Sequence, residues 1–407
     1  MSEQGPHRWP FLFIRQGEGI VKKRAGRRSV SALALLAVVL IAVLSACVSR
    51  AESSPEDKII LDCDMGAMND DTMALSMLLQ GEKQGNYKVI GITLEGGNVF
   101  IDAAFETDGV LQTCGWDNTK QFLADVGRTD IPVYRGTDYP LGFDGDSVSE
   151  LAAYYENAEY LQYCDGYGAI HAFTDTVSGA LCDSDAAVDF LIKSVKEEPG
   201  NVVIIATAPT MNIAKAVERD ASFAENVRAI YYMGGALGDC YEAETAAGKR
   251  VSAVGGANVT PYAEYNALYD PSALFTCLTA GFPRQVITPA ELSAAFESGV
   301  FEKLKAGKNP VALRWYEHYE KGFPEYPYWD PLTVFSYLRP EHIVRAEERY
   351  LTVNTDRNSD RFGETVAISA EEYGALSESD RSAYGRVTVI REVEGFWDET
   401  VALLCAG

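Results

Sequence analysis

The sequence predicts a single α/β domain built on a mostly parallel sheet flanked by helices. Short apolar runs typical of buried strands alternate with amphipathic segments of helical length, and polar side chains gather where several of these runs end. This alternation is typical of βαβ units, which form parallel sheets with helices on both faces. The chain of 407 residues is long enough for one large domain or two smaller ones.

The pattern predicts strands and helices in a regular order. Continuous apolar runs such as VVIIAT indicate strands, apolar residues spaced three and four apart indicate helices, and Pro199-Gly200 would close one of these helices. The acidic, Ser-rich segment 369–384 is expected to be a surface insertion. The predicted strands are residues 59–61, 87–94, 131–134, 202–207, 227–233 and 284–288. The predicted helices lie at residues 73–78, 103–114, 186–197 and 212–217.

The first 47 residues resemble the signal segment of a bacterial lipoprotein. Basic residues precede an apolar stretch, residues 32–44, that is too short for a comfortable membrane span, and Leu44-Ser45-Ala46-Cys47 resembles a lipobox. We therefore expect a lipid on Cys47 and anchorage at the extracytoplasmic face of the cell membrane. Residues 48–57 would form a polar tether and residues 58–407 the domain. An uncleaved signal anchor and an ordinary signal peptide are the alternatives.

The chain is strongly acidic, with 59 acidic and 35 basic residues and a net charge of −24. Nucleic-acid binding requires a basic surface, so this balance argues against a nucleic-acid partner. The charge is compatible with a soluble enzyme domain that acts on a small neutral substrate.

Four aspartates follow the first predicted strand within ten residues: Asp62, Asp64, Asp70 and Asp71. The carboxyl ends of parallel strands are where open α/β sheets bind ligands. Carboxylates this close repel one another unless a cation neutralises them or one of them stays protonated. Ca²⁺ and Mg²⁺ prefer such oxygen ligands. One or two aspartates would fit an ordinary helix N-cap, but four beside a buried strand favour a metal or catalytic site.

Other polar groups are predicted at the same edge of the sheet. Asn98, Thr207 and Met233 each come at the end of a predicted strand, and the loop from Asn258 to Tyr265 follows the Met233 strand. Amides and carboxylates that converge on a metal suit a polyhydroxylated ligand such as a sugar. Nothing in this region reads as a Gly-rich phosphate loop.

These motifs, taken together and in order, resemble the inosine-uridine-preferring nucleoside hydrolase family, in a lipoprotein-like branch with a longer Asp loop. The resemblance extends over about residues 58–405, and Met68 stands where that branch has a further Asp. The matching blocks are Asp62 to Asp71, GITLEGGN ending at Asn98, Ala206 to Ala214, Tyr232 to Gly235, Ala263 to Asp270, and Trp329-Asp330-Pro331.

The resemblance implies a Rossmann-like core and hydrolysis of ribonucleosides to ribose and free base by a Ca²⁺-activated water. By position, the Ca²⁺ ligands would be Asp64, Asp71, Asp330 and the backbone carbonyl of Thr207, and Asp64 would also be the general base. The resemblance also suggests a homo-oligomer. The residues expected to bind or support the substrate are Asp70, Asn98, Met233, Asn258, Glu264, Asn266 and Trp329.

The chain departs from the family at the group that protonates the leaving base. Well-known members have a histidine directly before the last aspartate, and here that position is Trp329, which has no acidic proton to give but could stack on a base. His171 and His318 are candidate replacements, although an ordinary surface or core role is the simpler reading of each. The base preference is left open.

Two other classes of function are compatible with parts of the pattern. A phosphatase of the haloacid-dehalogenase type also opens with Asp-x-Asp after a strand, but it requires Thr or Val where Gly66 stands. A non-catalytic nucleoside- or ribose-binding lipoprotein would retain the pocket without turnover. The complete set Asp64, Asp71 and Asp330 favours the enzyme, because a binding protein has no need of a poised water. Another N-riboside as substrate would leave the same pattern.

Overall fold

The structure is a computed structural model that describes residues 57–107, 110–145, 147–156, 180–244, 250–294, 298–321 and 328–406. The predicted signal segment, Cys47, nearly all of the tether and His171 lie outside these residues, so the expectations about them stay predictions. Among the residues that are described, each helix is too short or too polar to cross a membrane.

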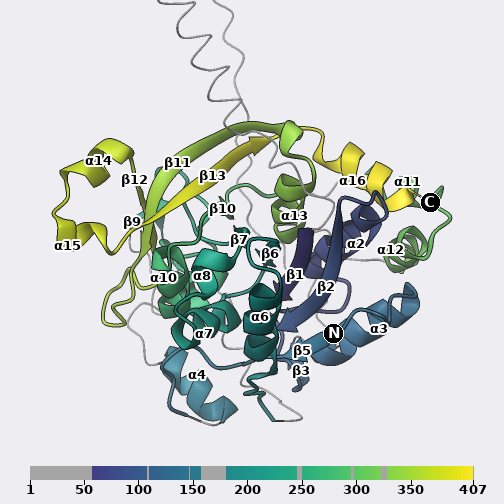
Figure 1. Cartoon of the computed structure of the whole chain (residues 1–407), viewed down its shortest axis with the longest axis horizontal. Helices are drawn as coiled ribbons and strands as arrows, with labels where there is room; N and C mark the ends of the chain where they lie inside the picture. Colours follow the sequence, from purple (N-terminus) through teal and green to yellow (C-terminus); the bar gives the residue numbers. More distant parts are fainter. Residues whose placement is uncertain are drawn as a thin grey trace, which may run out of the picture. The chain divides into compact units, whose positions relative to one another are not determined.

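Nine strands of the described chain form one sheet, in the order β12-β11-β13-β10-β7-β6-β1-β2-β5 (Figure 1). Neighbouring strands from β13 to β5 are parallel, whereas β11 runs antiparallel to both β12 and β13. The strands are β1 (Asp57–Cys63), β2 (Tyr87–Leu94), β5 (Val133–Arg135), β6 (Val202–Ala206), β7 (Ala229–Met233), β10 (Gln285–Thr288), β11 (Ile343–Val353), β12 (Thr365–Ile368) and β13 (Gly385–Val393).

Helices cover both faces of the sheet. Successive residues of a buried strand point to opposite faces, so each strand contributes side chains to both helix layers. Ile60 packs in one hydrophobic cluster, whereas Ile59 and Leu61 pack in the other. The Ile60 cluster includes residues of α6 (Ala186–Glu197), α7 (Met211–Arg219), α8 (Phe223–Asn226), α9 (Tyr265–Tyr269) and α10 (Pro271–Thr279). The other cluster includes residues of α2 (Asp70–Glu82), α3 (Gly115–Asp125), α11 (Ser298–Leu304), α12 (Pro310–Glu320), α13 (Asp330–Leu338) and α16 (Phe396–Cys405).

The predicted fold class is confirmed, and the six predicted strands correspond to β1, β2, β5, β6, β7 and β10. The helix predicted at 186–197 has those bounds in α6, and the one predicted at 212–217 lies within α7. The insertion 369–384 carries two short exposed helices, α14 (Ala370–Ala375) and α15 (Glu378–Arg381), beside the sheet edge in Figure 1.

The helix predicted at 103–114 is wrong. Strands β3 (Phe105–Thr107) and β4 (Val110–Gln112) pair there as an antiparallel hairpin, and helix α3 begins only at Gly115. The sequence between the strands is Asp108-Gly109, a dipeptide that favours hairpins, and the helical prediction from apolar spacing did not take it into account.

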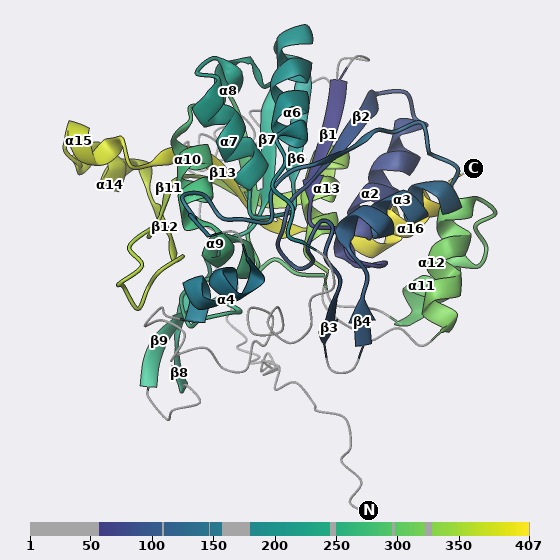
Figure 2. The same ribbon diagram turned by 90° about the horizontal axis from the view of Figure 1, so that it is seen from below.

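A second hairpin, β8 (Cys240–Glu244) with β9 (Arg250–Val254), was not predicted. Hairpin β3–β4 follows β2 and hairpin β8–β9 follows β7, so both leave the sheet at the carboxyl ends of its parallel strands. Figure 2 shows them projecting from the same end of the domain. Helix α4 (Val148–Glu156) lies near this end as well.

Candidate functional site

The loop from Asp64 to Asn69 joins β1 to α2 and places Asp70 and Asp71 in the first turn of the helix. Asn69 is the N-cap, and its Oδ1 accepts a hydrogen bond from the Thr72 amide at 3.2 Å while its Nδ2 donates to Asp71 at 2.8 Å. Acidic side chains are favoured in the first turn, where the helix dipole is positive. The local sequence therefore fixes both the start of α2 and the direction of the Asp71 carboxylate.

Three carboxylates from two helices converge at this point. Oxygens of Asp70, Asp71 and Asp330 lie within 4.8 Å of one another, and Asp330 comes from the first turn of α13. Asp71 and Asp330 are buried and Asp70 is half-buried. Burial and then the charge of Asp70 raise the pKa of Asp71 to about 7. Burial and the charges of Asp70 and Asp71 raise the pKa of Asp330 well above its ordinary range. Such a cluster could hold a metal ion.

Asp64 lies against Asp71 at the inner side of this cluster. Its burial and the Asp71 charge raise the pKa of Asp64 well above its ordinary range. The Asn98 amide donates a hydrogen bond to Oδ2 of Asp64, whereas the buried Oδ1 has no hydrogen-bond partner within the described chain. A Cβ at Gly97 would lie 2.1 Å from Oδ2, so only glycine lets the backbone come this close. An unsatisfied buried carboxylate oxygen is costly unless a cation or water completes it.

Thr207, at the end of β6, connects the cluster to the sheet. Its hydroxyl donates to Oδ1 of Asp71 at 2.7 Å, and its amide donates to the Asp62 carbonyl at 2.9 Å. Its own carbonyl accepts a hydrogen bond from Nδ2 of Asn266 at 3.0 Å. A carbonyl oxygen has a second lone pair, so this one can still serve as a ligand.

Hydrogen bonds, together with the peptide bond between Asp70 and Asp71, join polar residues of the site into a closed circuit. The Trp329 amide donates to Asp70 at 3.4 Å, and the Trp329 indole donates to the Ala290 carbonyl at 2.9 Å. The Ala290 amide donates to Gly235 at 2.9 Å, and the Gly235 amide donates to Glu264 at 2.8 Å. We call this circuit the site ring; its members are Asp70, Trp329, Ala290, Gly235, Glu264, Asn266, Thr207 and Asp71.

Glu264 has a structural task that its sequence position did not reveal. It is the N-cap of α9, and its two carboxylate oxygens accept hydrogen bonds from the amides of Gly235, Asn266 and Ala267 at 2.8 to 3.1 Å. The carboxylate is thereby held inside the site ring. Any contact with a ribose hydroxyl would use its remaining lone pairs.

The other predicted substrate residues lie on the same side of the sheet. They differ in exposure and in the hydrogen-bonding groups that remain open to a ligand. Oδ1 of Asn258 is a buried acceptor without a hydrogen-bond partner in the described chain, which fits a ligand hydroxyl. Asn266 donates to the carbonyl and the sulfur of Met233, both at 3.3 Å. Asn98 has an exposed side chain and contacts Asp64 through its backbone amide. Trp329 is half-buried at the start of α13.

Sequence reasoning missed a buried support beneath the site. Both oxygens of Glu95 accept backbone hydrogen bonds, from Thr210 at 2.5 Å and Asn212 at 2.7 Å, and so cap α7 from a different strand. Thr210 has a positive φ of 72° and makes no side-chain cap. Nδ2 of Asn212 also donates to Oδ1 of Asp62 at 2.9 Å. An acid inside the apolar block GITLEGGN was the available signal.

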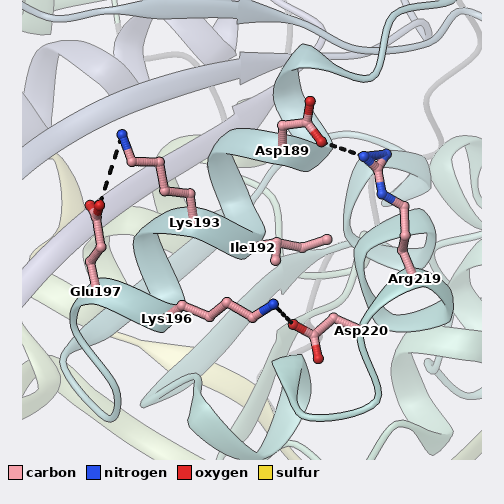
Figure 3. A pocket seen from close by; sticks show the side chains of 7 residues that line it. All are labelled: Asp189, Ile192, Lys193, Lys196, Glu197, Arg219 and Asp220. Atoms are coloured by element: carbon pink, nitrogen blue, oxygen red, sulfur yellow. Dashed lines mark hydrogen bonds and ion pairs between the residues drawn. The ribbon is translucent and has the colours of Figure 1, made fainter.

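A second concave surface lies away from this centre. A groove of about 480 Å³ runs between α6 and α7 (Figure 3). Its lining includes the carboxyl-terminal end of each of the two helices. Its charges are paired: Arg219 with Asp189, and Lys196 with Asp220 at 2.7 Å. The charged groups of this groove therefore pair with one another at the surface. The polar groups that converge on one point lie in the site ring and not in this groove.

The fold and the acidic centre together define an α/β protein with its polar site at the carboxyl ends of a parallel sheet. Comparison with known proteins identifies the family. The chain belongs to the inosine-uridine preferring nucleoside hydrolase family, whose model matches residues 59–398. The family predicted from the sequence motifs is thereby confirmed.

Similar proteins include a probable uridine nucleosidase 2 from Oryza sativa, 31% identical over 56% of this chain and 54% of the relative. A pyrimidine-specific ribonucleoside hydrolase RihA from Shewanella woodyi is 26% identical over 73% of this chain and 84% of the relative. The matched part of this chain thus spans little more than half the length of the rice protein.

Solved structures agree on the fold. A plant nucleoside hydrolase, PpNRh1, has a TM-score of 0.58 at 22% identity and covers 86% of this chain and 98% of its own. A purine-preferring ribonucleoside hydrolase from Gardnerella vaginalis has a TM-score of 0.57 at 21% identity, covering 86% of this chain and 100% of its own. At these identities the likeness establishes the fold.

Proposed function

We propose that this protein hydrolyses the N-glycosidic bond of ribonucleosides and releases ribose and the free base. The observation that carries the proposal is the cluster of Asp70, Asp71 and Asp330, whose oxygens lie within 4.8 Å of one another at the carboxyl edge of the sheet. Family membership supports the reaction class, since similar proteins are named as uridine nucleosidase and ribonucleoside hydrolase.

The residues present fit a hard divalent cation, and we infer Ca²⁺ held by Asp64, Asp71, Asp330 and the Thr207 carbonyl. Buried like charges repel strongly in the absence of a counter-ion. The buried Oδ1 of Asp64 has no hydrogen-bond partner among the described residues, so it is open to a cation. Ca²⁺ takes six to eight oxygen ligands in flexible geometry, which suits carboxylates from three segments and a carbonyl. When bound, the cation would lower the pKa of a water beside the anomeric carbon.

The chain's own residues then have distinct tasks. Asp64, buried beside Asp71, would accept the proton of the attacking water. Asp70 and Asn258 would bind ribose hydroxyls, with Glu264, Asn266 and Met233 forming the wall behind them, and Asn98 would hold Asp64 through its backbone. The transition state carries positive charge on the ribose, and fixed carboxylates would stabilise it more strongly than they stabilise the substrate.

Ribose release by a soluble fragment that starts after Cys47 tests this proposal. Purine and pyrimidine nucleosides would be supplied with Ca²⁺, with a chelator, and with the variant Asp64→Asn. We expect release that requires both the cation and Asp64. Calorimetric binding of a nucleoside without release in any condition would instead favour the non-catalytic binding lipoprotein.

We also propose that the protein is anchored by a lipid on Cys47 at the extracytoplasmic face of the membrane, on the strength of the lipobox-like motif. These residues lie outside the described structure. Incorporation of labelled fatty acid into the full chain, and its loss in Cys47→Ser, tests the anchor. Gel filtration of the fragment tests the homo-oligomer that the family resemblance suggests.

A further inference from the structure

The peptide group that joins Gly97 to Asn98 is hydrogen-bonded on both of its sides. Its N–H, from Asn98, donates to Oδ2 of Asp64, and its carbonyl, from Gly97, accepts a hydrogen bond from the hydroxyl of Tyr265 at 2.9 Å. Tyr265 and Asp64 are both buried, with 5% and 1% of their surfaces exposed. The Tyr265 hydroxyl is therefore connected to the proposed general base through a single peptide group.

This connection bears on the direction of the Asp64 carboxylate. Oδ2 is held by the peptide N–H, whereas the buried Oδ1 has no hydrogen-bond partner among the described residues. Because the two oxygens share one plane, holding one of them at a fixed donor restricts where the other lies. A donor at the carbonyl polarises the peptide and strengthens the bond made by its N–H, by about 10 to 30% in chains of hydrogen bonds. The Tyr265 hydroxyl thus supports the orientation of Asp64 without contacting it.

The loop that contains this peptide is fastened to a neighbouring segment on either side of it. The Gly96 amide donates to the Thr137 carbonyl at 2.9 Å, and the Ile101 amide donates to Oδ1 of Asp138 at 2.9 Å. Between these two points, Tyr265 supplies a hydrogen bond from a different element, helix α9. The position of the peptide therefore depends on α9 as well as on the loop.

The start of α9 also carries residues that belong to the proposed site. Glu264 and Asn266 form part of the wall behind the ribose, and Asn266 donates to the carbonyl of Thr207, a proposed ligand of the cation, at 3.0 Å. Tyr265 stands between these two residues in the chain and donates to Gly97. Three consecutive residues of one short helix thus fix the ribose wall, a cation ligand and the general base relative to one another.

We propose that Tyr265 is a positioning residue for this reaction, whose hydroxyl acts through one peptide group to hold Asp64 with its Oδ1 open to the cation and the attacking water. This inference rests on the proposed nucleoside hydrolysis and deepens it. The ring of Tyr265 packs in the hydrophobic cluster that contains Ile60, so the hydroxyl is the part that reaches the site. Hydrogen bonds are made along this path, and no proton changes its owner.

Tyr265→Phe removes the hydroxyl and keeps the ring, and Tyr269→Phe is the matched control. Tyr269 lies one turn further along α9, and its hydroxyl also donates to a backbone carbonyl, that of Asp138, at 2.9 Å. The N–H of that second peptide group, from Tyr139, donates to the hydroxyl of Thr137 at 3.1 Å. Each variant loses one buried hydrogen bond, but only Tyr265→Phe weakens a peptide group that holds the general base. Both variants keep their rings, so both are expected to fold.

The first measurement needs no cation. It follows the amide proton resonance of Asn98 in chelator, in the fragment that starts after Cys47, labelled with ¹⁵N at its asparagines. Tyr265→Phe should move this resonance to lower frequency, because the hydrogen bond to Asp64 weakens. Tyr269→Phe should leave the resonance in place.

The second measurement separates kcat from KM for the ribonucleoside that the fragment cleaves best, at saturating Ca²⁺. Tyr265→Phe should lower kcat by about tenfold to a hundredfold, the usual cost of losing a group that orients a metal ligand, and should change KM by less than about twofold. Tyr269→Phe should keep both constants within about twofold of the unmodified values.

An unchanged Asn98 resonance or an unchanged kcat in folded Tyr265→Phe would overturn the inference. Equal losses of kcat in both variants would also overturn it, because the effect would then be a general loss of packing. If the unmodified fragment cleaves no ribonucleoside, the proposed function fails, and the Asn98 resonance and the calorimetric affinity for Ca²⁺ decide whether Tyr265 positions Asp64. A shifted resonance and a weaker affinity in Tyr265→Phe alone support that role, and unchanged values refute it. Thermal melts in chelator show that each variant is folded.

Discussion

Replacing Asp330 by asparagine should change the stability of the metal-free protein and its response to calcium in opposite directions. Oxygens of Asp330, Asp70 and Asp71 lie within 4.8 Å of one another. At that separation each pair of charges repels by about 3.5 kcal/mol at an effective dielectric constant of about 20. Two such pairs would give about 7 kcal/mol, but protonating one carboxyl near pH 7.5 costs only about 5 kcal/mol, so protonation limits the strain.

Asparagine at 330 relieves this strain and loses smaller favourable terms. An acid in the first turn of α13 gains up to about 1 kcal/mol from the helix dipole. We therefore expect Asp330→Asn to stabilise the metal-free fragment by about 4 kcal/mol. For a domain of roughly 350 residues the entropy of unfolding is about 0.7 kcal/mol/K, so the melting temperature should rise by about 6 °C.

Calcium should stabilise the unmodified protein and leave Asp330→Asn almost unchanged. At a Ca²⁺ concentration of about one hundred times Kd, the unmodified fragment gains about 2.7 kcal/mol and about 4 °C. Asp330→Asn has lost a ligand and should gain almost nothing at the same concentration. Differential scanning calorimetry in chelator and in Ca²⁺ measures both shifts.

Asp117→Asn is the control, because Asp117 is an exposed first-turn acid of α3 and lies outside the site ring. It should leave the calcium shift at the unmodified value. A lower melting temperature for Asp330→Asn in chelator, with an unchanged calcium shift, would refute the reasoning. The carboxylates would then be a proton-sharing structural network and not a cation site.

Three further predictions concern groups around the site. Glu95→Ala should destabilise the fragment by about 2 to 4 kcal/mol in urea unfolding, because the buried amides of Thr210 and Asn212 lose their acceptor, and Glu95→Gln should cost less than half of that. Burial raises the pKa of Asp138 to about 7, so its stabilising effect is greatest at low pH and is lost as the pH rises through 7. The difference in unfolding free energy between the unmodified protein and Asp138→Asn should therefore fall by about 3 kcal/mol between pH 5 and 9, and a constant difference would contradict the assignment. Burial lowers the pKa of His318 to about 4, so its contribution to the free energy of unfolding is fully present above pH 6.5 and is lost as the pH falls through 4. His318→Gln should therefore make the free energy of unfolding fall less steeply at acid pH, and should leave kcat at pH 7 unchanged.

The parallel half of the sheet was predictable because its strands are short, apolar and bounded by turn residues. β6 is buried along its whole length, and its sequence VVIIA has no competing interpretation. The antiparallel extension was not predicted, because β11 alternates irregularly between half-buried and exposed residues and carries charged groups along much of its length. A strand with few fully buried residues gives little periodic signal.

The acidic cluster was predictable from local sequence, whereas its connections were not. Asp62 to Asp71 lie within ten residues, but the bond from Trp329 to Asp70 joins positions 259 residues apart. Glu264 also accepts a hydrogen bond from the amide of Gly235, which follows β7 and lies 29 residues earlier in the chain. Glu95 likewise serves a helix more than one hundred residues further on. Tertiary pairing of this kind leaves no pattern in either segment alone.

The segment that carries the Thr207 carbonyl is held by other strands at both of its ends. Its first amide donates to β1, at Asp62, and the amides of Thr210 and Asn212 donate to Glu95 at the end of β2. Hydrogen bonds to two neighbouring strands therefore fix the position of both ends of the segment. A cation arriving at the inner side of the site ring meets oxygens that already stand in place, and the rate of its capture should be set by the loss of its own hydration water and not by movement of the protein.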